Sequence, residues 1–165
     1  MKEIKRTLYL NKLIQRKENN LIKIITGIRR CGKSYLLDPL FKNYLLSTGI
    51  KEDHIIKIDL DLRMNKDFLN LDYIDTYIRN QIKDEKMYYV LLDEIQKVED
   101  FESVLNGFLH IKNVDVYVTG SNSKFLSSDI VTEFRGRGDE IRIYPLTFSE
   151  FLEAFNGSKE EAWNS

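Results

Sequence analysis

The chain has 165 residues, of which 42% are hydrophobic and 31% charged, and its formal net charge is −1. This composition argues against a disordered chain, and no run of 18 or more apolar residues suggests a transmembrane helix. The N-terminus lacks the apolar segment of a secretory signal and a single cysteine rules out an internal disulfide, so we expect a cytoplasmic protein.

Positive charge is concentrated at the start of the sequence. Residues 1–30 hold nine Lys or Arg and two Glu, a local charge of +7, so the remaining residues sum to −8. Such asymmetry can mark a surface that faces nucleic acid. The alternative, which we favour, is a solvated basic helix beside a phosphate-binding loop.

Apolar residues at helical spacing predict helices, and short apolar, β-branched runs predict strands. In chain order we expect a helix over 7–18, a strand over 21–26, a helix over 33–46, a strand over 54–60, a helix over 68–82, a strand over 87–92, a helix over 101–109, a strand over 114–119, a helix over 125–134, a strand over 140–144 and a helix from 147 to 155. Pro39 should kink the second helix near residues 35–38. Five strands alternating with helices predict an α/β fold with a parallel sheet covered on both faces.

Residues 27–34, with the sequence GIRRCGKS, match the phosphate-binding pattern G-x-x-x-x-G-K-[ST] at every fixed position. A strand precedes them and a helix follows, so backbone N–H groups and the positive end of a helix dipole should converge there. We expect Lys33 to reach the β- and γ-phosphates, Ser34 to bind Mg²⁺, and Gly32 to let the backbone approach. The residues expected around the nucleotide are Gly27, Ile28, Arg29, Arg30, Cys31, Gly32, Lys33, Ser34 and Tyr35.

Polar residues also follow two later strands at the point where each ends. Asp93 and Glu94 come directly after the third predicted strand, and Ser121 and Asn122 follow the fourth. Ligands of parallel sheets sit beyond the carboxyl ends of the strands, so these side chains should gather around the phosphate-binding loop. We expect Asp93 to anchor Mg²⁺, directly or through water, and Glu94 to polarise a water for in-line attack. Ser121 or Asn122 would orient that water or bind the γ-phosphate, and the pattern leaves open which.

A resemblance to a known family rests on four segments, ITGIRRCGKS, YYVLLDEIQKV, VYVTGSNSKFLSSDI and FRGRGDEIRIYPLTFSEFL. Together they resemble the prokaryotic AAA+ ATPases of the archaeal-ATPase-like group, over about residues 8–155. The resemblance implies a three-layer P-loop NTPase fold with sheet order 5-1-4-3-2, and ATP as the nucleotide. It also implies that Asp93 and Glu94 form the Walker B motif and that Ser121 and Asn122 form the sensor segment.

The resemblance further implies an arginine finger near the start of the fifth strand. Arg137 matches best and Arg135 second, and a solvated loop is the alternative for both. This loop would also offer a surface for self-association or for a protein partner. Gln96 and Lys97 follow the Walker B acids. They would relay nucleotide state to a partner or belong to a helix start or a loop, and both interpretations stay open.

Members of this group usually continue well beyond the ATPase domain. We therefore expect residues 1–155 to form that domain, with residues 1–20 as a helical lead-in and residues 156–165 as a polar tail that begins a missing C-terminal region.

The function expected is Mg²⁺-dependent ATP binding and hydrolysis coupled to conformational change. The alternatives are an ATP-binding switch with little hydrolysis, and a DNA-directed ATPase whose basic N-terminal helix holds nucleic acid. The paired acids argue against a small-molecule kinase, because those enzymes generally lack the second, water-polarising carboxylate.

Overall fold

The computed structural model describes residues 6–121, 134 and 136–145. Its helices are α1 (Thr7–Arg16), α2 (Lys33–Tyr35), α3 (Lys42–Ser47), α4 (Leu71–Gln81) and α5 (Phe101–Leu109), and its strands are β1 (Ile22–Thr26), β2 (Ile55–Asp59), β3 (Tyr88–Asp93), β4 (Val114–Gly120) and β5 (Gly138–Arg142). Apart from Phe134, the helices predicted over 125–134 and 147–155 and the tail at 156–165 lie outside the described residues. Within the described ranges, no helix combines the length and apolar character needed to cross a bilayer.

The five strands form one parallel sheet in the order β2-β3-β4-β1-β5, which confirms the predicted order read from the other edge. Because every neighbouring pair is parallel, all strands end at the same edge of the sheet. The register aligns Thr26 of β1 with Gly120 of β4 and Leu92 of β3 with Val118 of β4. The chain segments that leave β1, β3 and β4 therefore start side by side.

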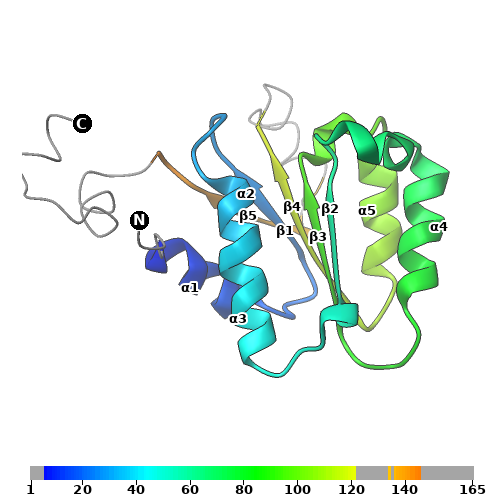
Figure 1. The fold of residues 1–165 in the computed structure, drawn as a ribbon, viewed down its shortest axis with the longest axis horizontal. Helices are drawn as coiled ribbons and strands as arrows, with labels where there is room; N and C mark the ends of the chain where they lie inside the picture. Colours follow the sequence, from blue (N-terminus) through cyan, green and yellow to red (C-terminus); the bar gives the residue numbers. More distant parts are fainter. Residues whose placement is uncertain (1–5, 122–133, 135, 146–165) are drawn as a thin grey trace, which may run out of the picture.

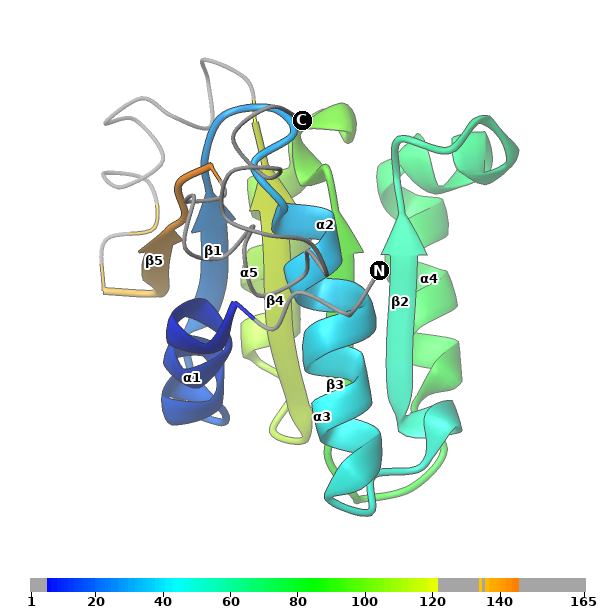
Figure 2. The ribbon, with the colours of Figure 1, turned by 60° about the vertical axis from the view of Figure 1, so that its left-hand side comes forward.

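Helices cover both faces of the sheet, as the apolar runs predict. Alternate residues along β3 belong to separate cores: Val90 and Leu92 pack on the face with α4 and α5, whereas Tyr89 and Leu91 pack on the face with α1, α2 and α3. Figures 1 and 2 show these two layers on opposite sides of the central strands. The result is a three-layer α/β sandwich.

The helix predicted over 33–46 is interrupted. A π-helical segment (Leu36–Phe41) separates α2 from α3, and Asp38 within it has extended dihedral angles of φ −145° and ψ 114°. Pro39 cannot donate a helical hydrogen bond and disfavours helical dihedrals in the residue before it, so the predicted kink is confirmed at Asp38. Further along the chain, a 3₁₀ segment (Arg63–Leu69) replaces part of the expected loop after β2.

Candidate functional site

The phosphate-binding loop depends on glycine at two positions. A Cβ on Gly27 would lie 2.6 Å from Cys31 Sγ and 2.7 Å from the backbone oxygen of Ile143, distances that no side chain accommodates. Gly32 has φ +96°, a left-handed conformation that glycine adopts without steric cost, and it directly precedes α2. Both glycines therefore hold the tight turn that leads from β1 into the helix.

Lys33 is folded back over this loop. Its Nζ donates hydrogen bonds to the backbone oxygens of Gly27, at 2.9 Å, and Ile28, at 2.8 Å, and the residue is only 4% exposed. The ammonium group thus contacts the backbone of the loop itself.

Arg6 supports the same loop from the N-terminal side. Its Nη1 donates to the backbone oxygen of Cys31 at 2.7 Å, and its Nη2 donates to the backbone oxygen of Tyr144 at 2.6 Å. The guanidinium also lies 4.6 Å from the centre of the Tyr9 ring. One buried cation therefore ties the loop to α1 and to the chain that follows β5.

The two acidic residues after β3 are fixed by a side chain of the neighbouring strand. Thr119, fully buried in β4, donates its hydroxyl proton to Asp93 Oδ1, and Thr119 Oγ1 accepts the backbone N–H of Glu94 at 2.9 Å. Glu94 has φ 61° and ψ 52°, a left-handed conformation that is uncommon outside glycine.

The Glu94 carboxylate is held by two further donors. Ser121 Oγ lies 2.9 Å from Oε2 and 3.2 Å from Oε1, and Gln96 Nε2 donates to Oε2. Ser121, directly after β4, and Gln96, two positions after Glu94, thus both donate to the Glu94 carboxylate.

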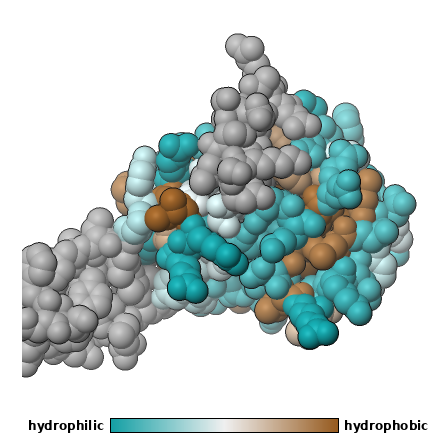
Figure 3. Space-filling view, turned by 90° about the horizontal axis from the view of Figure 1, so that it is seen from above, coloured by the Kyte–Doolittle hydropathy of each residue, from teal (hydrophilic) through white to brown (hydrophobic). Residues whose placement is uncertain are grey.

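These groups line a hollow of about 360 Å³ at the carboxyl edge of the sheet. Its walls are Arg29 from the phosphate-binding loop and Glu94, Gln96, Lys97 and Ser121 from the strand ends. Figure 3 looks onto this edge, where hydrophilic side chains cover most of the visible described surface. The hollow is large enough for a phosphate group and water, and its lining is polar.

The next strand end adds negative charge. Burial raises the pKa of Asp59 above its ordinary value, the charge of Asp93 raises it further, and the hydrogen bond from the Asp61 N–H opposes them only in part. Asp59 pairs with Asp93 in the register of β2 and β3. Two carboxylates thus lie at neighbouring strand ends.

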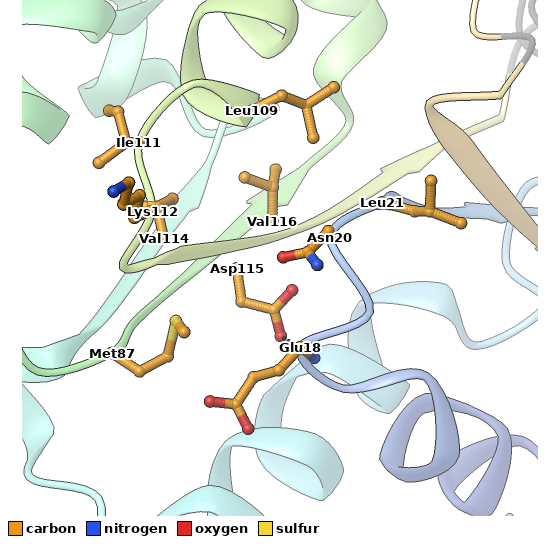
Figure 4. A pocket seen from close by; sticks show the side chains of 10 residues that line it. All are labelled: Glu18, Asn20, Leu21, Met87, Leu109, Ile111, Lys112, Val114, Asp115 and Val116. Carbon is orange, nitrogen blue, oxygen red and sulfur yellow. Dashed lines mark hydrogen bonds between the residues drawn. The ribbon is translucent and has the colours of Figure 1, made fainter.

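A second hollow, of about 270 Å³, lies at the opposite, amino edge of the sheet (Figure 4). Its carboxylate, Asp115, pairs with the buried Lys23 and also accepts the Tyr117 hydroxyl at 2.6 Å and the Glu18 N–H at 2.9 Å. Apolar side chains such as Met87 and Val116 form much of the remaining wall. Asp115, its buried carboxylate, is thus committed to the fold, and we assign the candidate site to the carboxyl edge.

The structure brings together most, but not all, of the predicted site residues. Lys33, Asp93, Glu94 and Ser121 lie at one edge, whereas Asn122 and Arg135 are outside the described residues. Arg137 lies at the other edge, because its backbone oxygen accepts the N–H of the first residue of β1 at 2.9 Å. Since β1 extends over about 13 Å, Arg137 does not reach the loop of its own chain. Among the described residues, no group of three or more His, Cys, Asp or Glu side chains is placed to hold a metal.

Three supporting residues were not predicted from sequence. Thr119 is a polar residue near the end of a largely apolar strand. This pattern could have predicted a hydrogen bond to the acidic residues at the end of the neighbouring strand. Gln96 was considered as a residue that relays nucleotide state or starts a helix, but its hydrogen bond to Glu94 was not predicted. The role of Arg6 could not be predicted from the sequence, because its two backbone partners are 25 and 138 residues away.

A family model described as "AAA domain" matches residues 19–152. An uncharacterized protein of Haemophilus influenzae is 38% identical over 155 residues, which are 93% of this chain and 38% of that protein. The chain spans only about 30–38% of the lengths of the curated relatives it matches.

Solved structures with the same fold are more distant in sequence. A Walker-type ATPase of Pyrococcus abyssi has a TM-score of 0.67 at 17% identity, covering 98% of this chain and 62% of that one. The Aeropyrum pernix ORC1 protein, solved in complex with DNA, has a TM-score of 0.57 at 13% identity, covering 90% and 47%. At these identities the likeness extends to the fold alone.

Proposed function

We propose that this chain, which belongs to the AAA domain family, binds ATP with Mg²⁺ at residues 27–34 and hydrolyses it. The observation that carries the proposal is the meeting of a lysine-bearing glycine loop with two fixed carboxylates at one edge of a parallel sheet. ATP hydrolysis requires this combination, because the loop cradles phosphates and the acids serve the metal and the attacking water.

Binding would rest on the loop, Lys33, Ser34 and Asp93. The Lys33 ammonium now donates to neutral backbone oxygens, and phosphate oxygens would offer it stronger, charge-assisted acceptors. The Ser34 hydroxyl and the Asp93 carboxylate are hard oxygen donors of the kind that Mg²⁺ takes alongside substrate phosphates. The metal would neutralise charge on the β- and γ-phosphates.

Hydrolysis would rest on Glu94, which we propose polarises the attacking water. Ser121 donates to its carboxylate and borders the same hollow, which supports a sensor role for the residues after β4. Asn122 stays a candidate for the same role. Arg137, and Arg135 as the second choice, are proposed as arginine fingers only toward a second copy of the chain, because Arg137 lies at the far edge of its own sheet.

A nucleotide-dependent switch with slow turnover is the second candidate function. It is favoured by the two side-chain donors, Ser121 and Gln96, that occupy the Glu94 carboxylate. In either case, the ATP state would drive conformational change in attached domains or partners.

The DNA-directed alternative draws little support from the N-terminal basic residues. Arg16 pairs with Asp139 at 3.0 Å, Lys17 pairs with Glu18 at 3.6 Å, and Lys23 is buried. Much of the local positive charge is thus engaged within the fold. DNA binding that falls steeply between low and physiological salt would revive this alternative.

Two variants test the proposal by nucleotide titration and phosphate release. Lys33→Ala should weaken Mg-ATP binding, and Glu94→Gln should keep binding while turnover falls by about 100-fold or more. Lys51→Ala and Glu85→Gln make the same chemical changes at exposed positions away from the hollow and should match the wild type.

The outcomes separate the candidates. Unchanged affinity in Lys33→Ala would refute the phosphate assignment, and wild-type turnover in Glu94→Gln would remove Glu94 from the mechanism. Tight binding with negligible wild-type turnover would select the switch.

A further inference from the structure

Gln96 leaves one of its polar atoms without a partner. It lies in the 3₁₀ turn Ile95–Lys97 that follows β3, and its Nε2 donates to Glu94 Oε2. Its amide oxygen, Oε1, is buried and accepts no hydrogen bond from the described part of the chain. Buried acceptors in folded proteins are almost always paired, so this oxygen calls for an explanation.

The orientation of the amide is set by Glu94. Rotating it by half a turn would place Oε1 against the carboxylate, where two acceptors repel and the Nε2 donor would be lost. Gln96 therefore satisfies Glu94 and leaves its own acceptor unpaired. A donor that arrives with the ligand would remove this cost.

The two oxygens of Glu94 are also used unequally. Oε2 accepts from Gln96 and lies 2.9 Å from Ser121 Oγ, whereas Oε1 lies 3.2 Å from the same hydroxyl. A hydroxyl has one proton, and the shorter contact takes it. Oε1 thus keeps lone pairs for a further donor, beside the hollow that Glu94 and Gln96 both line.

We propose that Gln96 is a positioning residue for the water that attacks the terminal phosphate. Its Nε2 holds Oε2 of Glu94, which leaves Oε1 of Glu94 as the base, and the amide oxygen of Gln96 accepts the second hydrogen of the same water. Gln96 lines the hollow and the terminal torsion of glutamine is soft, so a rotation much smaller than half a turn would expose this oxygen while Nε2 stays on Glu94. The inference rests on the proposed hydrolysis and names a residue that orients its nucleophile.

In the step itself, the water oxygen forms a bond to the terminal phosphorus. The bond from that phosphorus to the bridging oxygen breaks, and its electron pair leaves with ADP. One water proton passes to Glu94 Oε1, and the other stays on the new phosphate oxygen, hydrogen-bonded to Gln96. Two acceptors fix both hydrogens of the water and point a lone pair at phosphorus.

The test is Gln96→Met, which keeps the length of the side chain and removes both polar groups. Gln15→Met makes the same change on the exposed side of α1 and serves as the control. We expect Gln96→Met to bind Mg-ATP with unchanged affinity and KM, while kcat falls by about tenfold or more. Unchanged nucleotide affinity also shows that the variant folds.

A second measurement does not need turnover: the affinity for ADP and Mg²⁺ is compared in the presence of two phosphate analogues. Fluoroaluminate mimics the transferring phosphoryl group, and fluoroberyllate mimics the ground state. Gln96→Met should lose the extra affinity with fluoroaluminate and keep that with fluoroberyllate. Wild-type kcat, or full enhancement by fluoroaluminate, would overturn the inference. Failure of the proposed function looks different: the wild type itself would then bind no ADP with Mg²⁺, which would overturn both before any variant is compared.

Discussion

Replacing Thr119 with valine is the sharpest test of how the acidic strand end is held. Thr119 is 0% exposed, and its hydroxyl is the shared partner of the Asp93 carboxylate and the Glu94 N–H. Valine has nearly the same shape, so Thr119→Val opens no cavity and removes only the hydroxyl. Asp93, itself 2% exposed, would lose its donor, and the Glu94 N–H would lose its acceptor.

Leaving a buried donor or acceptor unpaired costs about 1–3 kcal/mol, so the two lost contacts together should reduce the free energy of unfolding by about 2–6 kcal/mol. Urea denaturation followed by circular dichroism measures this change. Thr119→Ser keeps the hydroxyl and deletes one methyl group, which costs about 1 kcal/mol. Thr76→Val on the exposed face of α4 should stay within about 0.5 kcal/mol of the wild type. If Thr119→Val proves as stable as Thr119→Ser, the hydroxyl does not hold the strand end.

Two further predictions concern stability away from the site. Lys23→Met should lower the free energy of unfolding, measured by urea denaturation, by about 3–5 kcal/mol, because it leaves Asp115 buried without its cation. Adding Asp115→Asn should recover part of this loss. If the effects of the two substitutions simply add, the pairing is contradicted. Burial alone lowers the pKa of His54, but the hydrogen bonds that its ring donates to the Asp53 and Asp84 carboxylates outweigh burial and raise the pKa above 6.5. Its contribution to stability is therefore full below about pH 6.5 and lost as pH rises through the raised folded value. Urea midpoints between about pH 6 and pH 8.5 should fall in the wild type, and a slope that persists in His54→Gln would assign it to another group.

The fold could be predicted from the sequence because its strands are buried on both faces. Runs such as residues 87–92 alternate between two cores, so nearly every residue is apolar and the strand stands out. The order of the strands came from family resemblance rather than from periodicity. Local chemistry also placed the kink, since Pro39 acts on the residue directly before it.

The site could be predicted from the sequence only in part. The loop at 27–34 and the acids after β3 are contiguous motifs whose spacing carries the chemistry. The contacts that hold them are not contiguous: Thr119 reaches Glu94 from 25 residues away, and Arg6 reaches Tyr144 from 138 residues away. Such pairs depend on strand order and register, which a single sequence does not supply.

These distant contacts leave the loop ready for an anion. Lys33 and Arg6 together engage the backbone oxygens of Gly27, Ile28 and Cys31, so acceptors of the loop are occupied from within. Within the described residues, no carboxylate forms an ion pair with Lys33, and its partners are neutral carbonyls. Transfer of its ammonium to a phosphate would therefore break no competing ion pair, and an anionic acceptor would replace two neutral ones. A site whose cation and carboxylates are fixed separately keeps both available for the same ligand.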